Sequence, residues 1–284
     1  MQKNNYTIRV MTRQEVGNLA VDWAAGEGWN PGLYDADCFH AADPGGFLVG
    51  LRDDEPVATI SVVKYGDFFG FLGFYIVKPE HRGKGYGIQI WNAGLARLAG
   101  RVVGLDGVVD RQADYRNSGF RLAYRNIRYQ GEGGGHCPAD PDIVRLSMLP
   151  FEEVRAYDQP FFPGSRTQFL KRWLNQPEGT ALGLLQNGQL AGYGVLRVCR
   201  QGYKMGPLFA DSPALAERLF LALKARAPAG APLFLDTPEV NPAAVGLARR
   251  HNMAAVFETA RMYTEKAPDL PFDRLFGVTT FELG

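Results

Sequence analysis

A glycine-rich turn is the segment whose residue types and spacing most clearly suggest chemistry. It follows the aromatic and β-branched run 74–77 and reads Arg82-Gly83-Lys84-Gly85-Tyr86-Gly87. The run predicts a buried strand, and the apolar spacing after the turn, through Leu98, predicts a helix. A turn without Cβ atoms that opens a helix presents backbone N–H groups and the positive end of the helix dipole. The segment is therefore predicted to bind a phosphate or pyrophosphate group.

The overall composition excludes several classes of function. The chain has 284 residues, a formal net charge of +1 and 46% hydrophobic residues, which is enough for two globular domains. Basic and acidic residues are balanced, so neither nucleic acid nor a membrane is expected as a partner. The start of the chain lacks the apolar core of a signal peptide, and no apolar run reaches membrane length. A cytoplasmic location is therefore expected.

The cysteines give no sign of a metal centre. Cys38, Cys137 and Cys199 are odd in number, far apart and without a CxxC pair. Neither a zinc site nor a disulfide framework is expected from this spacing.

The elements that must position the turn recur in the same order twice. The pattern predicts strands over 6–11, 47–49, 57–63, 68–77 and 102–106, and a further strand that ends near residue 129. It predicts helices over 12–23, 88–98 and 111–117. The same order of strands and helices repeats over 143–148, 166–175, 181–185, 190–198, 203–208, 211–224, 232–236, 241–250, 254–257 and 278–283. Leu105-Asp106 matches Leu235-Asp236, which favours one mixed α/β fold used twice. The alternative is a single larger mixed α/β domain.

A glycine-rich segment divides the two predicted domains. Residues 131–141 have a composition typical of a linker. The predicted N-terminal domain spans residues 1–130, and the C-terminal domain spans residues 142–284.

Two motifs in the first half carry a family resemblance. Arg82 to Gly87 matches the pattern Gln/Arg-x-x-Gly-x-Gly/Ala, and Tyr115-Arg116-Asn117-Ser118-Gly119-Phe120 matches Tyr-x-x-x-Gly-Phe. Residues 1–130 thereby resemble the GCN5-related N-acetyltransferase (GNAT) superfamily. The second half resembles it less well, because its counterpart of the turn lacks the arginine and the glycine spacing and carries Asp211. The chain resembles bacterial tandem-GNAT proteins with a degenerate YitH/HolE-type C-terminal GNAT domain.

The resemblance implies an N-acetyltransferase with acetyl-CoA as co-substrate and no metal. The pyrophosphate would bind the turn and the pantetheine arm would pair with the strand before it. The cofactor-binding residues are then Tyr75, Ile76, Val77, Arg82, Gly83, Lys84, Gly85, Tyr86, Gly87, Ile88 and Asn117.

The resemblance also suggests catalytic residues. Tyr115 lies where the family often places the acid that protonates the leaving thiolate, and a phenol has an ordinary pKa of about 10. Asp106 ends a central strand and could face the thioester as a catalytic residue. Its duplicate Asp236 suggests a role in the fold, and the two roles stay open at this point.

The acceptor is expected to be the primary amine of a small molecule or an amino sugar. The loop after the first helix contains two carboxylates and two indoles, Asp22, Trp23, Glu27 and Trp29. Carboxylates there would suit an amine, whereas the indoles could serve only in packing.

Two other functions stay open at this point. One is a non-catalytic acyl-CoA-binding regulatory module, and the other is a protein or aminoacyl acyltransferase. The latter needs an electropositive groove that the balanced composition does not indicate. A monomer and a homodimer fit the sequence equally.

Overall fold

The described strands form one continuous mixed sheet. The computed structural model describes residues 5–137 and 139–284; residues 1–4 and Pro138, which belong to the predicted N-terminal domain and linker, lie outside the described residues. The first half supplies β1 (Tyr6–Val10), β2 (Phe47–Arg52), β3 (Glu55–Tyr65), β4 (Phe69–Val77), β5 (Val102–Val108) and β6 (Arg121–Glu132). The second half supplies β7 (Ile143–Arg145), β8 (Thr180–Gln186), β9 (Gln189–Val198), β10 (Tyr203–Ala210), β11 (Pro232–Pro238), β12 (Ala254–Tyr263) and β13 (Leu275–Gly277).

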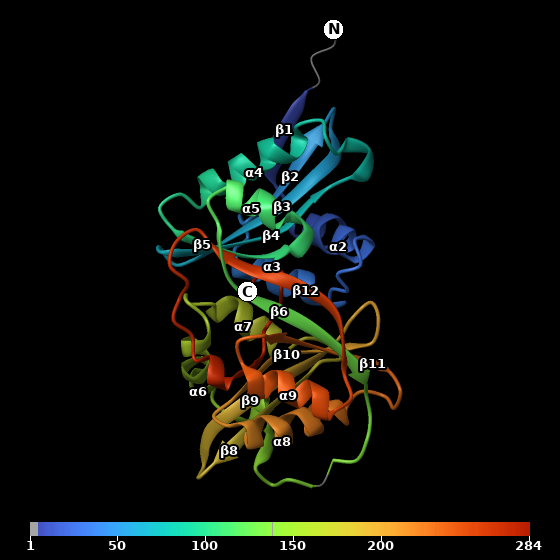
Figure 1. The fold of residues 1–284 in the computed structure, drawn as a ribbon, viewed down its shortest axis with the longest axis vertical. Helices are drawn as coiled ribbons and strands as arrows, with labels where there is room; N and C mark the ends of the chain where they lie inside the picture. The colour runs from blue at the N-terminus through green and yellow to red at the C-terminus, as the bar shows by residue number, and fades with distance from the viewer. Residues whose placement is uncertain (1–4, 138) are drawn as a thin grey trace.

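The two halves exchange strands in the middle of this sheet. The strand order is β1-β2-β3-β4-β5-β12-β6-β11-β10-β9-β8-β7, with β13 paired to β10. β12 comes from the second half but lies antiparallel between β5 and β6, whereas β6 comes from the first half and also pairs with β11. The exchange lies at the centre of the molecule (Figure 1). β6 also continues two residues into the segment expected to be a linker.

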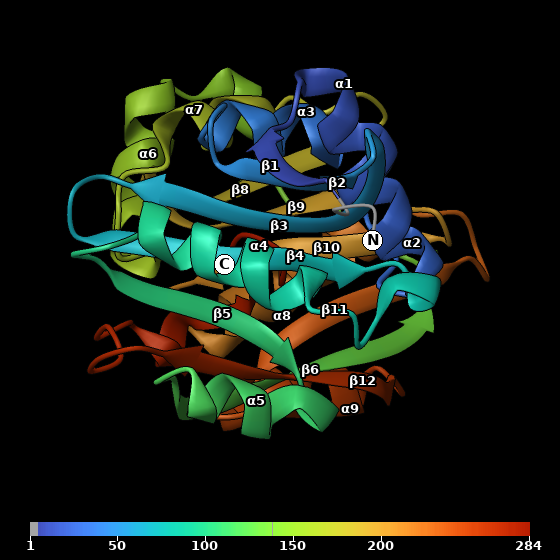
Figure 2. The same ribbon diagram turned by 90° about the horizontal axis from the view of Figure 1, so that it is seen from above.

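The helices form two outer groups and one inner group. The outer groups are α4 (Tyr86–Arg97) with α5 (Gln112–Asn117) on the first half, and α8 (Pro213–Lys224) with α9 (Pro242–Arg250) on the second. Between the halves lie α2 (Asp22–Gly26), α3 (Asp35–Ala42) and α7 (Thr167–Trp173) (Figure 1). α1 (Arg13–Glu15) contacts α3 and α6 (Phe151–Asp158) contacts α7, and these four helices lie along the same side of the molecule (Figure 2). None of the helices that the structure describes has the length and apolar character needed to span a membrane.

The described residues form three hydrophobic cores in this layering. One core lies under α4 and α5, another under α8 and α9. The third lies between the halves and joins Phe39 and Phe74 of the first half to Trp173 and Phe209 of the second. Because a shared core and shared strands join them, the two halves are expected to fold as one unit.

The last residues differ from the sequence-based expectation. A closing strand was predicted over 278–283, but the strand observed is Leu275–Gly277, and the following residues run without regular structure back to the first half. We call residues 275–284 the C-terminal tail. Two hydrogen bonds mark its path: the Val278 N–H donates to the Asp236 carbonyl oxygen at 2.8 Å, and the Tyr65 hydroxyl donates to the Leu283 carbonyl oxygen at 3.1 Å.

Candidate active site

An opening between β4 and β5 forms the centre of the candidate site. These parallel strands pair from Phe69↔Val102 to Leu72↔Leu105, and the recorded ladder ends there. At that point β4 bulges against β3, and Phe74 takes a φ of 47° that is costly for a bulky residue. The Thr59 hydroxyl donates to the Phe74 carbonyl oxygen at 2.8 Å and supports the bulge. Residues 74–77 therefore diverge from β5.

A cleft of about 640 Å³ occupies this opening. Its lining joins the diverging end of β4, the glycine turn, the end of β5, the N-terminal part of α5, one edge of β12 and the C-terminal tail. Side chains from α5 reach it from the α4/α5 side of the sheet, whereas Trp29 and Phe281 belong to the core between the halves. The cleft is thus lined from both faces of the sheet.

The glycine turn is shaped to accept an anion. Gly83 and Gly85 have φ values of 74° and 83°, and a Cβ atom on either would meet nothing within 4 Å. α4 starts directly after Gly85, so the first backbone N–H groups of a long helix lie beside open space. These features fit a pyrophosphate group.

Arg82 connects the turn to two neighbouring elements. Its Nε donates to the Val77 carbonyl oxygen at 2.9 Å, and its Nη2 pairs with Glu27 Oε1 at 2.6 Å. The arginine therefore fixes the turn against the end of β4 and holds the loop after α2 over the cleft.

Most residues expected to bind the cofactor line the cleft, and three do not. The lining includes Tyr75, Ile76, Val77, Arg82, Gly83, Gly85, Gly87 and Ile88. Lys84 and Asn117 are exposed and lie outside it. Tyr86 is buried with its ring 4.9 Å from that of Tyr6, so its side chain is a packing element.

Tyr115 lies in the cleft with its ring held on two sides. The ring stacks on Trp91 at 5.8 Å and lies so close to Gly107 that a Cβ atom there would clash with it. Burial, with a contribution from the nearby Tyr75, raises the pKa of the Tyr115 phenol to about 12. The phenol is therefore protonated at neutral pH, and the same burial makes it a weaker acid than an exposed tyrosine.

Asp106 also lines the cleft, but its carboxylate is fully engaged. Arg261 donates from Nε to Oδ1 at 2.9 Å and from Nη2 to Oδ2 at 2.5 Å, and Asn126 and Thr259 also donate to Oδ1. The carboxylate is buried with its arginine. This geometry favours the role in the fold over the role in catalysis.

The four residues expected to bind the acceptor are divided by the structure. Glu27 and Trp29 line the cleft. Asp22 instead forms an ion pair with Arg200, and the Trp23 ring packs under Lys78 Nζ at 5.2 Å; both lie outside the lining.

The second half contributes four lining residues that sequence reasoning missed. These are Phe257 and Thr259 on β12 and Phe281 and Glu282 on the tail. They reach the first half only because β12 and the tail cross over, which local sequence patterns do not encode. The sequence assigned the candidate site to the first half alone.

In the second half the tail fills the corresponding opening. The β10–β11 ladder ends at Met205↔Leu235, and β13 then pairs with the free end of β10. A Cβ atom on Gly206 would lie 2.6 Å from the Val278 carbonyl oxygen. Asp211, at the position of the missing turn, accepts hydrogen bonds from Arg274 and Tyr157.

Comparison with known proteins finds matches to both halves. The acetyltransferase (GNAT) family profile matches residues 14–120, and an acetyltransferase (GNAT) domain profile matches residues 154–277. The holothin acyltransferase of Pseudoalteromonas sp. (strain SANK 73390) is 31% identical over 271 residues, covering 95% of this chain and 92% of that protein.

Solved structures share the whole fold. A putative acetyltransferase from Pyrococcus horikoshii has a TM-score of 0.82 at 22% identity and covers 100% of this chain and 99% of its own. A tandem GNAT protein from the clavulanic acid biosynthesis pathway has a TM-score of 0.65 at 14% identity, covering 93% of this chain and 100% of its own. At such identities the likeness shows the fold alone.

Fold, sequence and relatives together define the class of protein as an acyltransferase. The chain belongs to the GNAT family, and it carries two GNAT domains in tandem.

Proposed function

We propose that the protein transfers an acetyl group from acetyl-CoA to a primary amine of a small molecule or an amino sugar. The observation that carries this proposal is the cleft between β4 and β5, which runs from the glycine turn to an aromatic, acidic end. The glycine turn and the diverging strand suit the pyrophosphate and pantetheine parts of coenzyme A. The named activity of the holothin acyltransferase lends support, because that relative aligns over nearly the whole chain.

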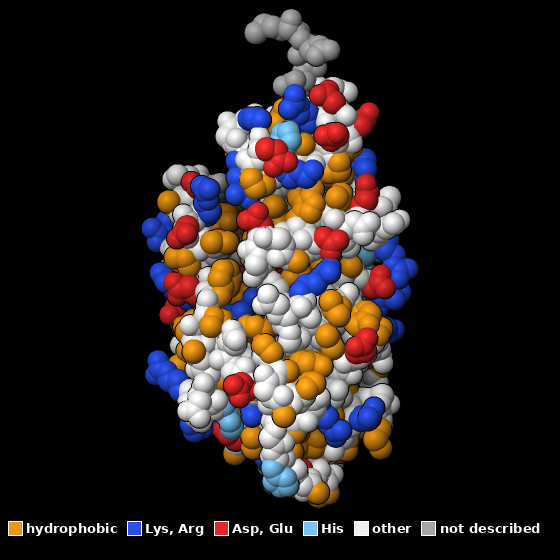
Figure 3. All heavy atoms as spheres, turned by 90° about the vertical axis from the view of Figure 1, so that its right-hand side faces the viewer, with side chains coloured by type: hydrophobic (Ala, Val, Ile, Leu, Met, Phe, Trp, Pro, Cys, Tyr) orange, Lys and Arg blue, Asp and Glu red, His pale blue; other side chains and the backbone are white. Residues whose placement is uncertain are grey.

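The acceptor end suits a small cation with an apolar body. Trp29, Phe257 and Phe281 supply aromatic surface, and Glu282 supplies a carboxylate. Acidic and basic side chains are interspersed over the face in Figure 3, which does not favour a polyanionic acceptor such as nucleic acid.

In direct transfer, the groups around the cleft would each have a separate role. The backbone of the diverging end of β4 would hold the pantetheine arm and donate hydrogen bonds to the thioester oxygen. Tyr115 would donate a proton to the departing thiolate. Arg82 would keep the loop that carries Glu27 and Trp29 closed over the acceptor.

The direct test is release of free thiol from acetyl-CoA in a screen of small amines, with affinity for coenzyme A measured separately by calorimetry. Thiol release that depends on an amine supports the proposal. Tight binding without thiol release from any amine would instead identify a non-catalytic acyl-CoA-binding module.

Replacing the Tyr115 phenol tests the proton donor. Tyr115→Phe should lower kcat by about 100-fold, within the usual range for one general acid, while the Kd for acetyl-CoA changes by less than about twofold because the ring packing is kept. Tyr203→Phe, at the start of β10 and outside the cleft lining, is the matched control. Unchanged turnover in Tyr115→Phe would remove Tyr115 from this role.

A further inference from the structure

We propose that Glu282, supplied by the C-terminal tail of the second half, is the proton acceptor for the amine in the cleft of the first half. The proposal rests on the acyl transfer proposed above and adds a catalytic residue to it. The second GNAT domain would then supply a catalytic residue to the cleft of the first.

The first argument is position. The side chain of Glu282 is buried, at 4% exposure of the residue, yet the residue lines the cleft. Its backbone contacts Gly73 so closely that a Cβ atom on Gly73 would clash with the Glu282 carbonyl oxygen. Gly73 is the first residue of β4 after the ladder with β5 ends, so Glu282 lies at the point where the strands begin to diverge.

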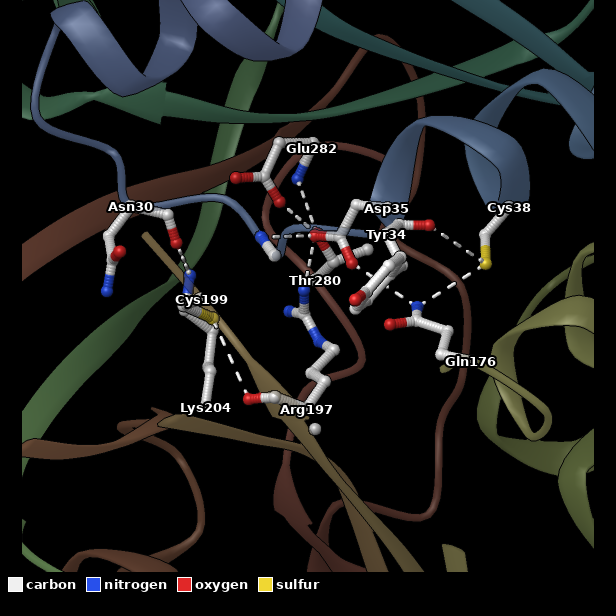
Figure 4. Close-up of polar contacts among 12 residues, drawn as sticks. Asn30, Tyr34, Asp35, Cys38, Gln176, Arg197, Cys199, Lys204, Thr280 and Glu282 are labelled. Atoms are coloured by element: carbon white, nitrogen blue, oxygen red, sulfur yellow. Dashed lines mark hydrogen bonds and ion pairs between the residues drawn. The ribbon is translucent and has the colours of Figure 1, made fainter. Parts of the chain in front are cut away.

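The second argument is the availability of the carboxylate. The Thr280 hydroxyl donates to Glu282 Oε2, and the Glu282 N–H donates back to Thr280 Oγ1 at 3.3 Å, which fixes the side chain (Figure 4). Within residues 5–137 and 139–284, Glu282 forms no ion pair. Two other carboxylates of the cleft lining are each engaged by an arginine. Asp106 pairs with Arg261, and Glu27 pairs with Arg82.

The cations around Glu282 are each held by another group. Arg128 on β6 pairs with Asp236, and Arg197 on β9 pairs with Asp35. Lys204 on β10 donates from Nζ to the Asn30 carbonyl oxygen at 2.9 Å. Figure 4 shows the last two contacts beside Glu282 and Thr280. These cations place positive charge around Glu282, but none of the three forms an ion pair with its carboxylate.

The third argument is the disposition of acid and base. Tyr115 packs with the core under α4 and α5, whereas Phe281, next to Glu282, belongs to the core between the halves. The two groups therefore reach the cleft from opposite faces of the sheet. Direct transfer uses two separate groups, because the proton that nitrogen loses and the proton that sulfur gains are on different substituents of the same carbon, and this arrangement keeps the acid and the base apart.

The reaction step then balances. The amine lone pair forms the C–N bond, the C–S bond breaks, and its electron pair stays on sulfur. An acceptor that binds as an ammonium first passes one proton to the Glu282 carboxylate, which frees the lone pair. The second N–H proton leaves nitrogen for solvent as the C–N bond forms, and the thiolate takes the phenolic proton of Tyr115. Solvent exchange returns both side chains to their starting states.

The test compares Glu282→Gln and Glu282→Asp with wild type on acceptors of graded basicity. For amines that are mostly ammonium at the assay pH, Glu282→Gln should lower kcat/KM by about 100-fold or more. For weakly basic amines that are already neutral, the loss should shrink to below about tenfold. Glu282→Asp should recover part of the activity, and the Kd for acetyl-CoA should stay within about twofold.

Asp273→Asn is the matched control, because this exposed carboxylate lies in the segment just before the tail and outside the cleft lining. Its activity should equal that of wild type. An equal loss with every acceptor, or full activity in Glu282→Gln, would overturn the role of Glu282 alone. A folded wild-type protein that acylates no amine would overturn the proposed function, and this inference with it.

Discussion

Gly85→Asp should weaken the binding of acetyl-CoA by at least about 100-fold. The substitution places a carboxylate at the residue before α4, where the structure offers open space and backbone N–H groups. Two unit charges about 4 Å apart at an effective dielectric constant of about 20 repel by about 4 kcal/mol, and about 2.7 kcal/mol already corresponds to a 100-fold change in Kd. Calorimetric titration with acetyl-CoA measures the effect.

Two matched variants separate charge from backbone strain. Gly85→Asn has nearly the same shape and accepts a positive φ, so it should lose much less affinity than Gly85→Asp. Gly100→Asp carries the same charge at a residue with a φ of 78° and open space beyond α4, away from the cleft lining. It should bind acetyl-CoA like wild type. Wild-type affinity in Gly85→Asp would refute the phosphate-binding role of the turn.

The local features of this site could be predicted from the sequence because they depend on neighbouring residues. A glycine turn between an aromatic strand and an amphipathic helix is specified within about 25 residues of chain. The turn at Gly83 and Gly85, α4 and the short helix α5 that carries Tyr115 follow from such local patterns.

The acceptor end could not be predicted because it depends on strand pairing between distant segments. β12 alternates in a way that suits any antiparallel partner, and nothing local directs it to β5 instead of β11. Phe257, Thr259 and Glu282 therefore gave no signal as site residues. Asp106 was ambiguous for the same reason, because its partner Arg261 is 155 positions away.

The exchange of strands is marked by two equivalent buried ion pairs. Asp106 on β5 lies opposite Arg261 on β12, and Asp236 on β11 lies opposite Arg128 on β6. Each pair is bidentate and joins one half to the strand received from the other. A one-residue slip in pairing would turn each buried arginine to the other face of the sheet. The pairs therefore specify the register of the exchanged strands.

Asp106→Asn should consequently lower the free energy of unfolding by about 3–5 kcal/mol, the usual cost of leaving one buried partner uncompensated. Burial alone would lower the pKa of Arg261, but Asp106 outweighs it and holds that pKa well above its ordinary value. Removing Asp106 takes that support away, but an arginine is not deprotonated in proteins near neutral pH, so Arg261 stays charged without its partner. Chemical denaturation of the protein without ligand measures the loss.

Replacing both members of the pair identifies the cause of that loss. The double variant Asp106→Leu/Arg261→Met removes both charges and should recover most of the stability, because an apolar pair avoids the cost of burying an unpaired cation. Glu258→Gln breaks the partly exposed pair between β12 and Arg125 on β6 and should cost less than about 1 kcal/mol. Full stability in Asp106→Asn together with lost turnover would restore Asp106 as a catalytic residue. Equal losses in the single and double variants would show that shape, not charge, is what Asp106 contributes.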